Sequence, residues 1–511
     1  MYPGTFAAKF PDKPAVIMGD GTTVTYGELE ARSAQLSHYL ASVGVGEGDH
    51  VALLAENHPR FFEVYWGVIR SGAYLTAVNR HLSAEEIAYL IEDSDAAVVI
   101  TTAAMLDKAA AALALTSDER HCLAIDAQHD GFEDYDAALA PWPTIAPEHQ
   151  PRGDVMLYSS GTTGTPKGIQ RPLTGRQVDD PTGRSGVGHF LGLTESAIYL
   201  CPAPLYHGAA IQWSAAAQTI GATVVVMEKF DAQDMLRVID RDRVTHLQVV
   251  PTMFVRLLKL TESVRRGYDL SSLQFVVHAA APCPVYIKRQ MIEWLGPIVH
   301  EYYAGTEGVG MTFISADEWM THQGSVGRAV MGTLHICDES GTELAEGEAG
   351  IAYFEMPGSR WEYHGDAGKT RSARHPQHEG WATYGDIGYL DAEGYLYLTD
   401  RRSYTIISGG VNIYPAEIES ALVEHHKVMD AAVFGLPDPE MGQFVQAVVQ
   451  LDEGVDPSPD VAEELRAYLR TRLAGFKIPR ALDFRSELPR QPNGKLYKQP
   501  LQEEYLAAAA R

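Results

Sequence analysis

The sequence predicts an α/β fold with a large first domain and a smaller second domain. The chain has 511 residues, more than one compact core usually contains, so we expect at least two domains. Short runs rich in β-branched residues alternate with amphipathic stretches over most of the length, which is typical of sheets flanked by helices. We therefore expect a large N-terminal domain of β-sheets flanked by helices over residues 1–400, and a mobile, smaller α+β domain over residues 401–511.

Periodicity places the individual elements. Apolar, β-branched runs predict strands at residues 50–55, 96–101, 222–227 and 273–279, because such runs suit buried strands. Apolar residues at intervals of three and four predict helices at residues 84–93 and 232–242. From Ile336 to Leu398, short strands with Gly-rich turns predict a small β-barrel-like subdomain. Beyond a boundary near residues 400–403, the same patterns predict helices at 415–426 and 460–473 and strands at 430–436 and 444–451.

Composition restricts the partners and the compartment. The net charge of −26 would repel a phosphodiester backbone, so we expect no nucleic-acid partner. The four cysteines lie far apart in the chain, at Cys122, Cys201, Cys283 and Cys337. Their spacing suits neither a metal site nor a disulfide framework, so a reducing cytoplasm fits. We expect no signal peptide and no transmembrane segment, because apolar runs of about 18 residues are missing.

The stretch "YSSGTTGTPKG", residues 158–168, predicts a phosphate-binding loop. Its eleven residues include five Ser or Thr hydroxyls, three glycines and one lysine. A Walker loop would have glycine before the lysine and Ser or Thr after it, but Pro166 precedes Lys167 and Gly168 follows it. The following residues contain Pro172 and have no helical period, so we expect a loop between two strands. Backbone N–H groups, hydroxyls and Lys167 would then hold the phosphate; the alternative is a plain polar hairpin.

Five further motifs follow in order: "HAAAPCP" (278–284), "YYAGTEG" (302–308), "GWATYGDIGYL" (380–390), "TDRRSYTIISGG" (399–410) and "LPRQPNGKLYKQPL" (488–501). Together with the phosphate loop they resemble the adenylate-forming superfamily, which includes acyl-CoA synthetases, amino-acid adenylation domains and firefly-type luciferases. The resemblance covers nearly the whole chain. The chain departs from the family at Ala304, where a glycine is usual, at His278, where a small residue is usual, and at Ser403.

The resemblance implies roles for individual residues. Tyr303 would pack on adenine, Thr306 would meet the α-phosphate, Asp386 and Arg401 would bind the ribose, and Lys495 would be the catalytic lysine, acting with Thr306 and Glu307. The implied nucleotide-binding residues are Ser159, Ser160, Gly161, Thr162, Thr163, Gly164, Lys167, Ala279, Ala280, Ala281, Tyr302, Tyr303, Ala304, Thr306, Asp386, Arg401 and Lys495. The implied Mg²⁺ ligands are Glu307 and Ser159.

The resemblance also implies where the acid, the thiol and the hinge lie. The acyl pocket would be formed by His207, Gly208, Ala210, Ile211, His278, Gly308 and Met311. Ser408, Gly409 and Gly410 would line the coenzyme A channel, where only small residues fit. The hinge residue in the family is Asp or Lys; here that position is Ser403, so a role for its charge is lost.

The implied reaction has two steps and uses ATP, Mg²⁺ and coenzyme A. A carboxylate attacks the α-phosphate to form acyl-AMP and pyrophosphate, and a thiol then displaces AMP while the small domain rotates. His207 stands where amino-acid adenylation domains have an aspartate, and an unpaired ammonium would be costly to bury, so we expect a hydrophobic monocarboxylic acid that is fatty, alicyclic or aromatic. The alternatives are an enzyme that loads a carrier protein, a luciferase-like oxygenase and a non-catalytic nucleotide-binding protein. A homodimer is compatible with the sequence.

Overall fold

The computed structural model describes residues 2–159, 166–180, 188, 190–358, 360–401, 404–409, 411–490 and 496–509. Of Ser159, Asp400, Arg401 and Ala509 it describes the backbone alone. The chain divides into two compact units. The first unit comprises Met1–Val249, Leu260–Val276 and Arg360–Thr370, and the second comprises Val250–Lys259, Val277–Ser359 and Arg371–Arg511.

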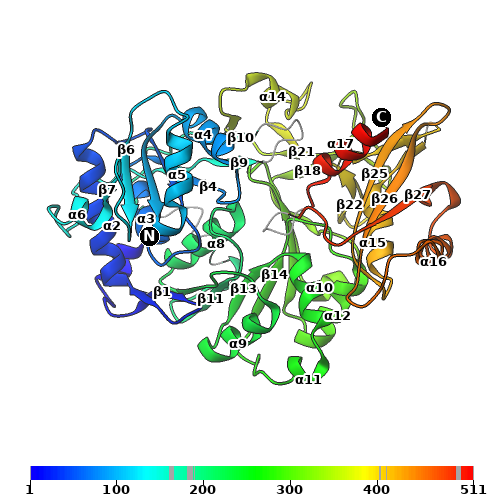
Figure 1. Cartoon of the computed structure of the whole chain (residues 1–511), viewed down its shortest axis with the longest axis horizontal. Helices are drawn as coiled ribbons and strands as arrows, with labels where there is room; N and C mark the ends of the chain where they lie inside the picture. The colour runs from blue at the N-terminus through cyan, green and yellow to red at the C-terminus, as the bar shows by residue number, and fades with distance from the viewer. Residues whose placement is uncertain are drawn as a thin grey trace. The chain divides into compact units, whose positions relative to one another are not determined.

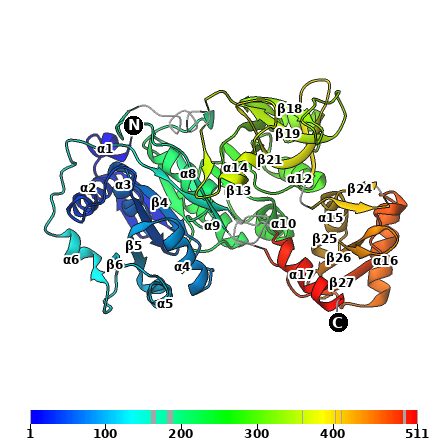
Figure 2. The same ribbon diagram turned by 90° about the horizontal axis from the view of Figure 1, so that it is seen from above.

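The first unit contains a parallel sheet with helices on both faces (Figures 1 and 2). Its strand order is β7-β6-β5-β3-β4-β8, and every neighbouring pair is parallel. The strands are β3 (His50–Leu54), β4 (Tyr74–Val78), β5 (Ala96–Thr102), β6 (His121–Ile125), β7 (Glu133–Asp134) and β8 (Asp154–Val155). The helices are α2 (Tyr26–Ser42), α3 (Phe61–Arg70), α4 (Ala84–Asp93) and α5 (Leu106–Leu113). The predicted strands at 50–55 and 96–101 and the predicted helix at 84–93 are confirmed.

A second group of strands in this unit has the order β13-β11-β12-β1-β2. It is parallel except for the edge strand β2. Its members are β1 (Pro14–Met18), β2 (Thr23–Thr25), β11 (Ile198–Cys201), β12 (Thr223–Val226) and β13 (His246–Val249), with helices α8 (Gly208–Gln218) and α9 (Ala232–Asp242). Helix α9 begins where the Asp231 side chain accepts from the Asp234 N–H, an N-cap that satisfies one of the helix's unpaired donors. The predicted elements at 222–227 and 232–242 are confirmed.

Antiparallel strands dominate the second unit. β15 (Val299–Ala304), β16 (Met311–Ile314) and β17 (Arg328–Met331) pair in that order. A four-stranded antiparallel sheet, of order β18-β19-β21-β22, covers the stretch in which short strands were predicted. Its strands are β18 (Thr333–Cys337), β19 (Gly350–Glu355), β21 (Trp381–Leu390) and β22 (Leu396–Arg401). Strand β14 (Phe275–His278) and helix α12 (Val285–Leu295) precede β15 in the chain.

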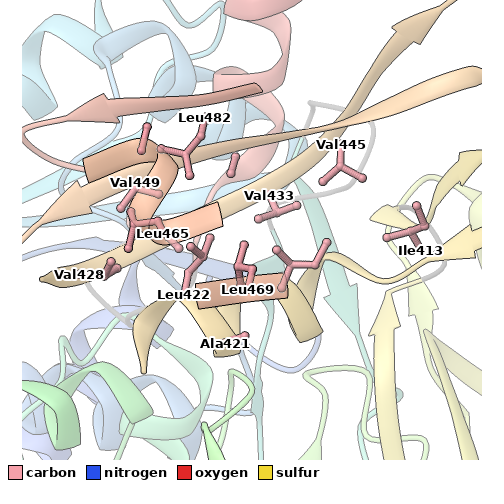
Figure 3. Packing of buried hydrophobic residues seen from close by; sticks show 14 of the residues in the cluster. Ile413, Ala421, Leu422, Val428, Val433, Val445, Val449, Leu465, Leu469 and Leu482 are labelled. Atoms are coloured by element: carbon pink, nitrogen blue, oxygen red, sulfur yellow. The ribbon is translucent and has the colours of Figure 1, made fainter. Parts of the chain in front are cut away.

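The last part of the second unit is an α+β assembly around two long strands. β25 (Val428–Asp438) and β26 (Gly442–Leu451) form a hairpin, with β27 (Ala481–Arg485) parallel to β26. Helices α15 (Pro415–Val423) and α16 (Pro459–Arg470) lie on one face and α17 (Lys498–Ala509) lies on the other (Figures 1 and 2). The strand alternates accordingly: Val433 packs with Leu422 and Leu465 (Figure 3), whereas Phe434 packs with Leu501 on the opposite face.

The helices also bear on the question of a membrane crossing. Over the residues that the structure describes, no helix combines the length and the apolar character that such a crossing needs.

Candidate functional site

The predicted phosphate loop joins two antiparallel strands of the first unit. β9 (Leu157–Ser159) pairs with β10 (Lys167–Gln170), with Lys167 opposite Ser159 and Gly168 opposite Tyr158. The prediction of a strand-to-strand loop, without the following helix of a Walker loop, is confirmed. The predicted phosphate ligands Ser160, Gly161, Thr162, Thr163 and Gly164 lie outside the described residues.

Two tyrosine hydroxyls lie beside the Asp93 carboxylate near this loop. The Tyr158 hydroxyl, just before the loop, donates to Asp93 Oδ2 at 2.7 Å. The Tyr89 hydroxyl lies 3.0 Å from Asp93 Oδ1 and 3.2 Å from the carbonyl oxygen of Pro166, just after the loop. Burial and the neighbouring Asp93 carboxylate raise the pKa of Tyr158, so its hydroxyl stays protonated and able to donate. Asp93, the last residue of α4, thus holds the end of β9, and the single Tyr89 proton can go either to Asp93 or to the Pro166 carbonyl.

Lys167 faces an acidic residue at the start of another helix. Its Nζ atom lies 3.9 Å from Asp366 Oδ2, and Asp366 Oδ1 accepts from the Lys369 N–H of α14 (Ala367–Ser372) at 2.9 Å. This distance is long for an ion pair, and a partly exposed pair contributes little stability. A phosphate oxygen forms a charge-assisted hydrogen bond with an ammonium group, so it could replace Asp366 as the partner of Lys167.

The predicted acyl-pocket residues of the first unit surround the start of α8. His207 is the N-cap residue, Gly208 begins the helix, and Ala210 and Ile211 are buried. The ring of Tyr206 packs against His207 at 4.3 Å between centroids. Burial, followed by the nearby His81 ring, lowers the pKa of His207 to about 3. His207 is therefore a neutral side chain at neutral pH and offers no charge to a ligand.

The alanine loop of "HAAAPCP" begins at the end of β14 in the second unit. Ala280 has a φ of +75°, a left-handed conformation that is uncommon for a residue other than glycine. Ala279 is buried, whereas Ala280 is exposed and Ala281 is half-buried. A strained, exposed backbone with short side chains leaves room for a flat ring to approach closely, as the adenine prediction requires.

His278, which directly precedes this loop, lies in the core of the second unit. Its side chain is fully buried beside Phe254, at 5.3 Å between ring centroids. Its Nε2 atom lies 3.4 Å from Glu301 Oε2, and neither ring nitrogen has a hydrogen-bond partner in the described part of the chain. Burial, followed by the charge of Lys288, lowers the pKa of His278 well below its usual value. The ring is thus neutral; its predicted place in the acyl pocket stays a prediction.

A buried ion pair joins α12 to β15 next to this histidine. Lys288 Nζ donates to Glu301 Oε2 at 2.6 Å, and both side chains are almost completely buried. The same ammonium lies 4.8 Å from the centroid of the Trp319 ring, a cation–π geometry. His278 precedes the alanine loop and Glu301 precedes Tyr302, so the pair lies next to the start of each segment predicted to contact adenine.

The tyrosine motif brings two predicted nucleotide residues into direct contact. The Tyr303 hydroxyl donates to Asp386 Oδ2 at 2.6 Å. Asp386 lies on β21, opposite Arg401 of β22 in the strand register, although the side chain of Arg401 is outside the description. Tyr302 is buried, and Ala304 ends the strand. Tyr303, on β15 of one sheet, thus contacts Asp386, which is paired with Arg401 on β21 and β22 of another sheet in the same unit. All three were predicted to surround the adenosine.

Thr306, Glu307 and Gly308 occupy the turn between β15 and β16. The Gly308 N–H donates to the Gly305 carbonyl at 3.1 Å, and Gly308 has a φ of +66°. Met311 is the first residue of β16. Within the described ranges, no group of three or more His, Cys, Asp or Glu side chains gathers as a metal site. Magnesium commonly takes one or two carboxylates and fills its remaining positions with phosphate oxygens and water, so a single Glu307 beside a triphosphate fits this ion.

Sequence reasoning missed Tyr384, which packs under this turn. Its hydroxyl donates to the Gly310 carbonyl at 2.8 Å, and the Gly310 N–H lies 3.2 Å from the same oxygen. Its ring is 5.5 Å from that of Tyr303. Tyr384 stands in the same motif as Asp386, two residues before it, and this nearness was the one signal in the sequence. Its contacts with residues about eighty positions away follow from no local sequence pattern.

The predicted coenzyme A residues lie on a hairpin near the C-terminus. Ser408 ends β23 (Ile406–Ser408), which pairs with β24 (Val411–Ile413). Gly409 has a φ of +58°, and its N–H donates to the Met441 carbonyl at 2.8 Å. Gly410, the hinge residue Ser403 and the predicted catalytic Lys495 are outside the described residues. Their roles therefore stay predictions.

Comparison with known proteins places the chain in a family. Residues 5–360 match the AMP-binding enzymes, and residues 417–495 match the C-terminal domain of AMP-binding enzymes. The chain therefore belongs to the AMP-binding enzyme family, which confirms its resemblance to the adenylate-forming superfamily and its α/β fold class.

Named relatives span nearly the whole chain. A feruloyl-CoA synthase from Amycolatopsis is 32% identical, over 97% of this chain and 97% of the relative. A fatty acid–[acyl-carrier-protein] ligase, ScoC from Streptomyces coeruleorubidus, is 30% identical over 98% and 95%. The solved structure of o-succinylbenzoate CoA synthetase from Bacillus subtilis, in complex with an acyl-adenylate intermediate, has a TM-score of 0.82 and 29% identity, covering 98% of this chain and 97% of that one.

Proposed function

We propose that this AMP-binding enzyme is an ATP-dependent acid–CoA ligase. It would activate a hydrophobic monocarboxylic acid, fatty, alicyclic or aromatic, as acyl-AMP with release of pyrophosphate, and then transfer the acyl group to coenzyme A with release of AMP. The observation that carries the proposal is the Tyr303–Asp386 contact at 2.6 Å, in the unit that also holds the Thr306–Glu307 turn. The acyl-adenylate in the o-succinylbenzoate CoA synthetase structure supports the same chemistry.

The adenosine would be held by Asp386, Tyr303 and the alanine loop. A carboxylate can accept hydrogen bonds from both ribose hydroxyls, and the hydrogen bond from Tyr303 orients Asp386 for that role. The exposed, left-handed Ala280 lets the backbone approach the adenine plane. Arg401, opposite Asp386 in the register, would contact the same ribose.

Charge neutralisation would drive the first step, because an anion attacks a polyanion. Lys495 would bridge the attacking carboxylate and an α-phosphate oxygen, and Thr306 would contact the same phosphate. Lys167 and the loop hydroxyls would hold the departing pyrophosphate. Mg²⁺ would supply further positive charge, held by Glu307 and Ser159. No general base is required, because a carboxylic acid is already ionised at neutral pH.

The second step would use a different face of the small C-terminal part. One lysine cannot easily serve both steps, so rotation about Ser403 would withdraw Lys495 and present Ser408, Gly409 and Gly410 to the thiol of coenzyme A. The position of Gly409, whose φ is +58°, favours a residue without a side chain. The thiol would attack the acyl carbonyl and AMP would leave.

The acid would be apolar. His207 is neutral because burial lowers its pKa to about 3, so it provides no partner for a charged group on the substrate. Gly208, at the first turn of α8, leaves space beside it, and Gly308 and Met311 would complete the pocket.

Product analysis tests this function directly. The purified chain would be incubated with Mg·ATP, coenzyme A and acids of graded length and ring content, and products separated by liquid chromatography with mass detection. We expect AMP, pyrophosphate and an acyl-CoA, all dependent on the acid. Formation of ADP and phosphate would exclude the mechanism.

A carrier protein is a second candidate acceptor, because the relative ScoC is a fatty acid–[acyl-carrier-protein] ligase. Replacing coenzyme A with a phosphopantetheinylated carrier protein separates the two. An acylated carrier without any acyl-CoA would replace the first proposal by this one.

A further inference from the structure

A bulge in β21 directs two side chains toward the nucleotide turn. Tyr353 pairs with Thr383 and Ile351 pairs with Ile387, so Ala352 alone stands opposite Tyr384, Gly385 and Asp386. Gly385, with a φ of +82°, takes the left-handed conformation that such a bulge needs. Bulges re-aim side chains and are frequent beside active sites. Here the bulge brings Tyr384 and Asp386, two residues apart, against the same Tyr303 side chain.

Tyr384 holds the far side of the turn that carries Thr306 and Glu307. The hydroxyl donates to the Gly310 carbonyl at 2.8 Å and faces the Gly310 N–H at 3.2 Å. The ring packs closely against Gly305: a Cβ atom added there would be 2.3 Å from Tyr384 Cε1 and 2.8 Å from Glu307 Oε2. One side chain thus contacts residue 305 before the two functional residues and residue 310 after them.

The hydroxyl remains a hydrogen-bond donor under working conditions. Burial raises the pKa of Tyr384 to about 12, and the nearby Glu307 carboxylate acts in the same direction while backbone N–H groups of the turn oppose it. A protonated phenol can both donate to a carbonyl and accept from an N–H. The double contact with Gly310 therefore persists at neutral pH.

We infer that Tyr384 is a positioning residue for ATP activation: its hydroxyl and ring fix the Gly305–Gly310 turn so that Thr306 and Glu307 meet the magnesium-bound phosphates while Asp386 holds the ribose. This rests on the proposed function. The contacts of Tyr384 are with backbone and glycine, so it acts through the turn and does not touch the reacting atoms. Binding of Mg·ATP and formation of acyl-AMP should depend on it, whereas attack by the thiol should not.

The test compares Tyr384→Phe with Tyr389→Phe. Tyr389 lies on the same strand and stacks on Tyr397 at 5.0 Å between centroids, so this control removes an equivalent oxygen away from the turn. Calorimetry with Mg²⁺ and α,β-methylene ATP measures binding without turnover. We expect Tyr384→Phe, which removes both hydrogen bonds to Gly310, to weaken this binding about tenfold, equivalent to about 1.4 kcal/mol, and to raise the Mg²⁺ concentration for half-saturation. The affinity of Tyr389→Phe for the analogue should stay within about twofold of that of the wild-type chain.

Activity provides the second arm. Acid-dependent ATP–pyrophosphate exchange should fall about tenfold in Tyr384→Phe, whereas thioester formation from supplied acyl-AMP should keep its rate. Unchanged binding and exchange in a folded Tyr384→Phe would overturn the inference. If the unchanged chain forms no acyl-AMP with any acid, the proposed function fails, and the calorimetric arm still decides the role of Tyr384.

A second variant guards against misfolding. Gly305→Ala keeps the Tyr384 hydroxyl but places a methyl group into its ring, so it should displace the turn and weaken Mg·ATP-analogue binding in the same way. Its urea midpoint is measured alongside. A folded Gly305→Ala chain that binds the analogue with unchanged affinity would also overturn the inference.

Discussion

At the scale of single residues, a hydroxyl and a carboxylate meet at the proposed nucleotide end of the site. The 2.6 Å hydrogen bond from Tyr303 to Asp386 joins two side chains 83 positions apart in the sequence. An ionised acceptor makes this hydrogen bond stronger than a neutral pair. Asp386 is buried, which fixes its orientation before any ligand arrives. A ribose would thus meet a preorganised acceptor.

Asp386→Ala should raise the KM for ATP by about ten- to a hundredfold, because hydrogen bonds to a charged group contribute about 1.5–3 kcal/mol. Initial rates at varied ATP concentration measure the change. Glu393→Ala is the control, since Glu393 is an exposed carboxylate in the turn that ends the same hairpin. A KM for ATP in Asp386→Ala equal to that of the control would remove Asp386 from the ribose site.

Most of these residues could be named from the sequence, because they lie in short motifs that resemble those of the adenylate-forming superfamily; their roles stay predictions. Tyr303, Thr306, Glu307, Asp386 and Lys167 were all named in this way. The residues that support them could not be. Asp93 binds Tyr158 across 65 positions, and Tyr384 reaches Gly310 across 74. Neither contact follows from a periodicity or a motif, because it depends on strand pairing and on a bulge.

At the scale of elements, one buried charge pair connects α12 with β15. Lys288 would be expected on the exposed face of an amphipathic helix, but it is fully buried. Burial lowers the pKa of Lys288 and the Glu301 carboxylate opposes this. A buried pair is weak evidence for stability in itself, although breaking one partner is costly. We expect the pair mainly to fix the position of α12 relative to β15.

Lys288→Ala should lower the free energy of unfolding by about 3–5 kcal/mol, because it leaves Glu301 buried without its partner. Urea denaturation followed by circular dichroism measures this. Arg289→Ala, an exposed neighbour on the same helix, should change stability by less than about 0.5 kcal/mol. The double variant Lys288→Met/Glu301→Leu should recover most of the loss. Equal stability of Lys288→Ala and Arg289→Ala would show that the pair is energetically idle.

Element boundaries were less predictable than the elements. The strand predicted at residues 430–436 extends from Val428 to Asp438, because its pairing with β26 continues to the hairpin turn at Asp438 and Gly442. The helix predicted at 415–426 ends at Val423. There the His425 N–H turns to the Leu422 carbonyl, and the chain enters β25 within a few residues. Contacts with other elements determine where β25 and α15 end, and the periodicity of the sequence carries no information about those contacts.

At the scale of the whole molecule, buried histidines make stability depend on pH. Burial lowers the pKa of His207 to about 3, of His50 and His300 to about 4, and of His278 well below 6.5. Each folded-state pKa is below the unfolded value, so the unfolded chain binds more protons between the two. The stabilisation is complete above about pH 6.5 and is lost as the pH falls toward the folded-state values.

Urea denaturation should therefore give a lower free energy of unfolding at pH 5 than at pH 7. Each of the most deeply buried rings, His207 and His278, would contribute up to about 1.4 kcal/mol per pH unit. His207→Gln should reduce the slope, whereas His149→Gln, at an exposed position, should leave it unchanged. Stability that is constant or rises between pH 7 and pH 5 would contradict this account.

The proposed rotation of the C-terminal part predicts that the two half-reactions depend on different residues. Lys495→Ala should abolish acyl-AMP formation and largely spare thioester formation from supplied acyl-AMP, because the proposed mechanism uses this lysine in the first step alone. Pyrophosphate exchange measures acyl-AMP formation, and acyl-CoA release from supplied acyl-AMP measures thioester formation. Lys498, three residues further on and paired with Glu419 at 2.6 Å, offers Lys498→Arg as a comparison that keeps the charge. Equal loss of both steps in Lys495→Ala would contradict domain rotation.

The fate of the carboxylate oxygen tests the central claim most directly. An acid that the enzyme accepts, labelled with ¹⁸O in its carboxyl group, would be supplied with Mg·ATP and coenzyme A, and the products examined by mass spectrometry. Attack at the α-phosphorus followed by cleavage of the acyl-oxygen bond by the thiol leaves one labelled oxygen in AMP and none in pyrophosphate. Label in phosphate or pyrophosphate, or unlabelled AMP beside acyl-CoA, would contradict an acyl-adenylate mechanism.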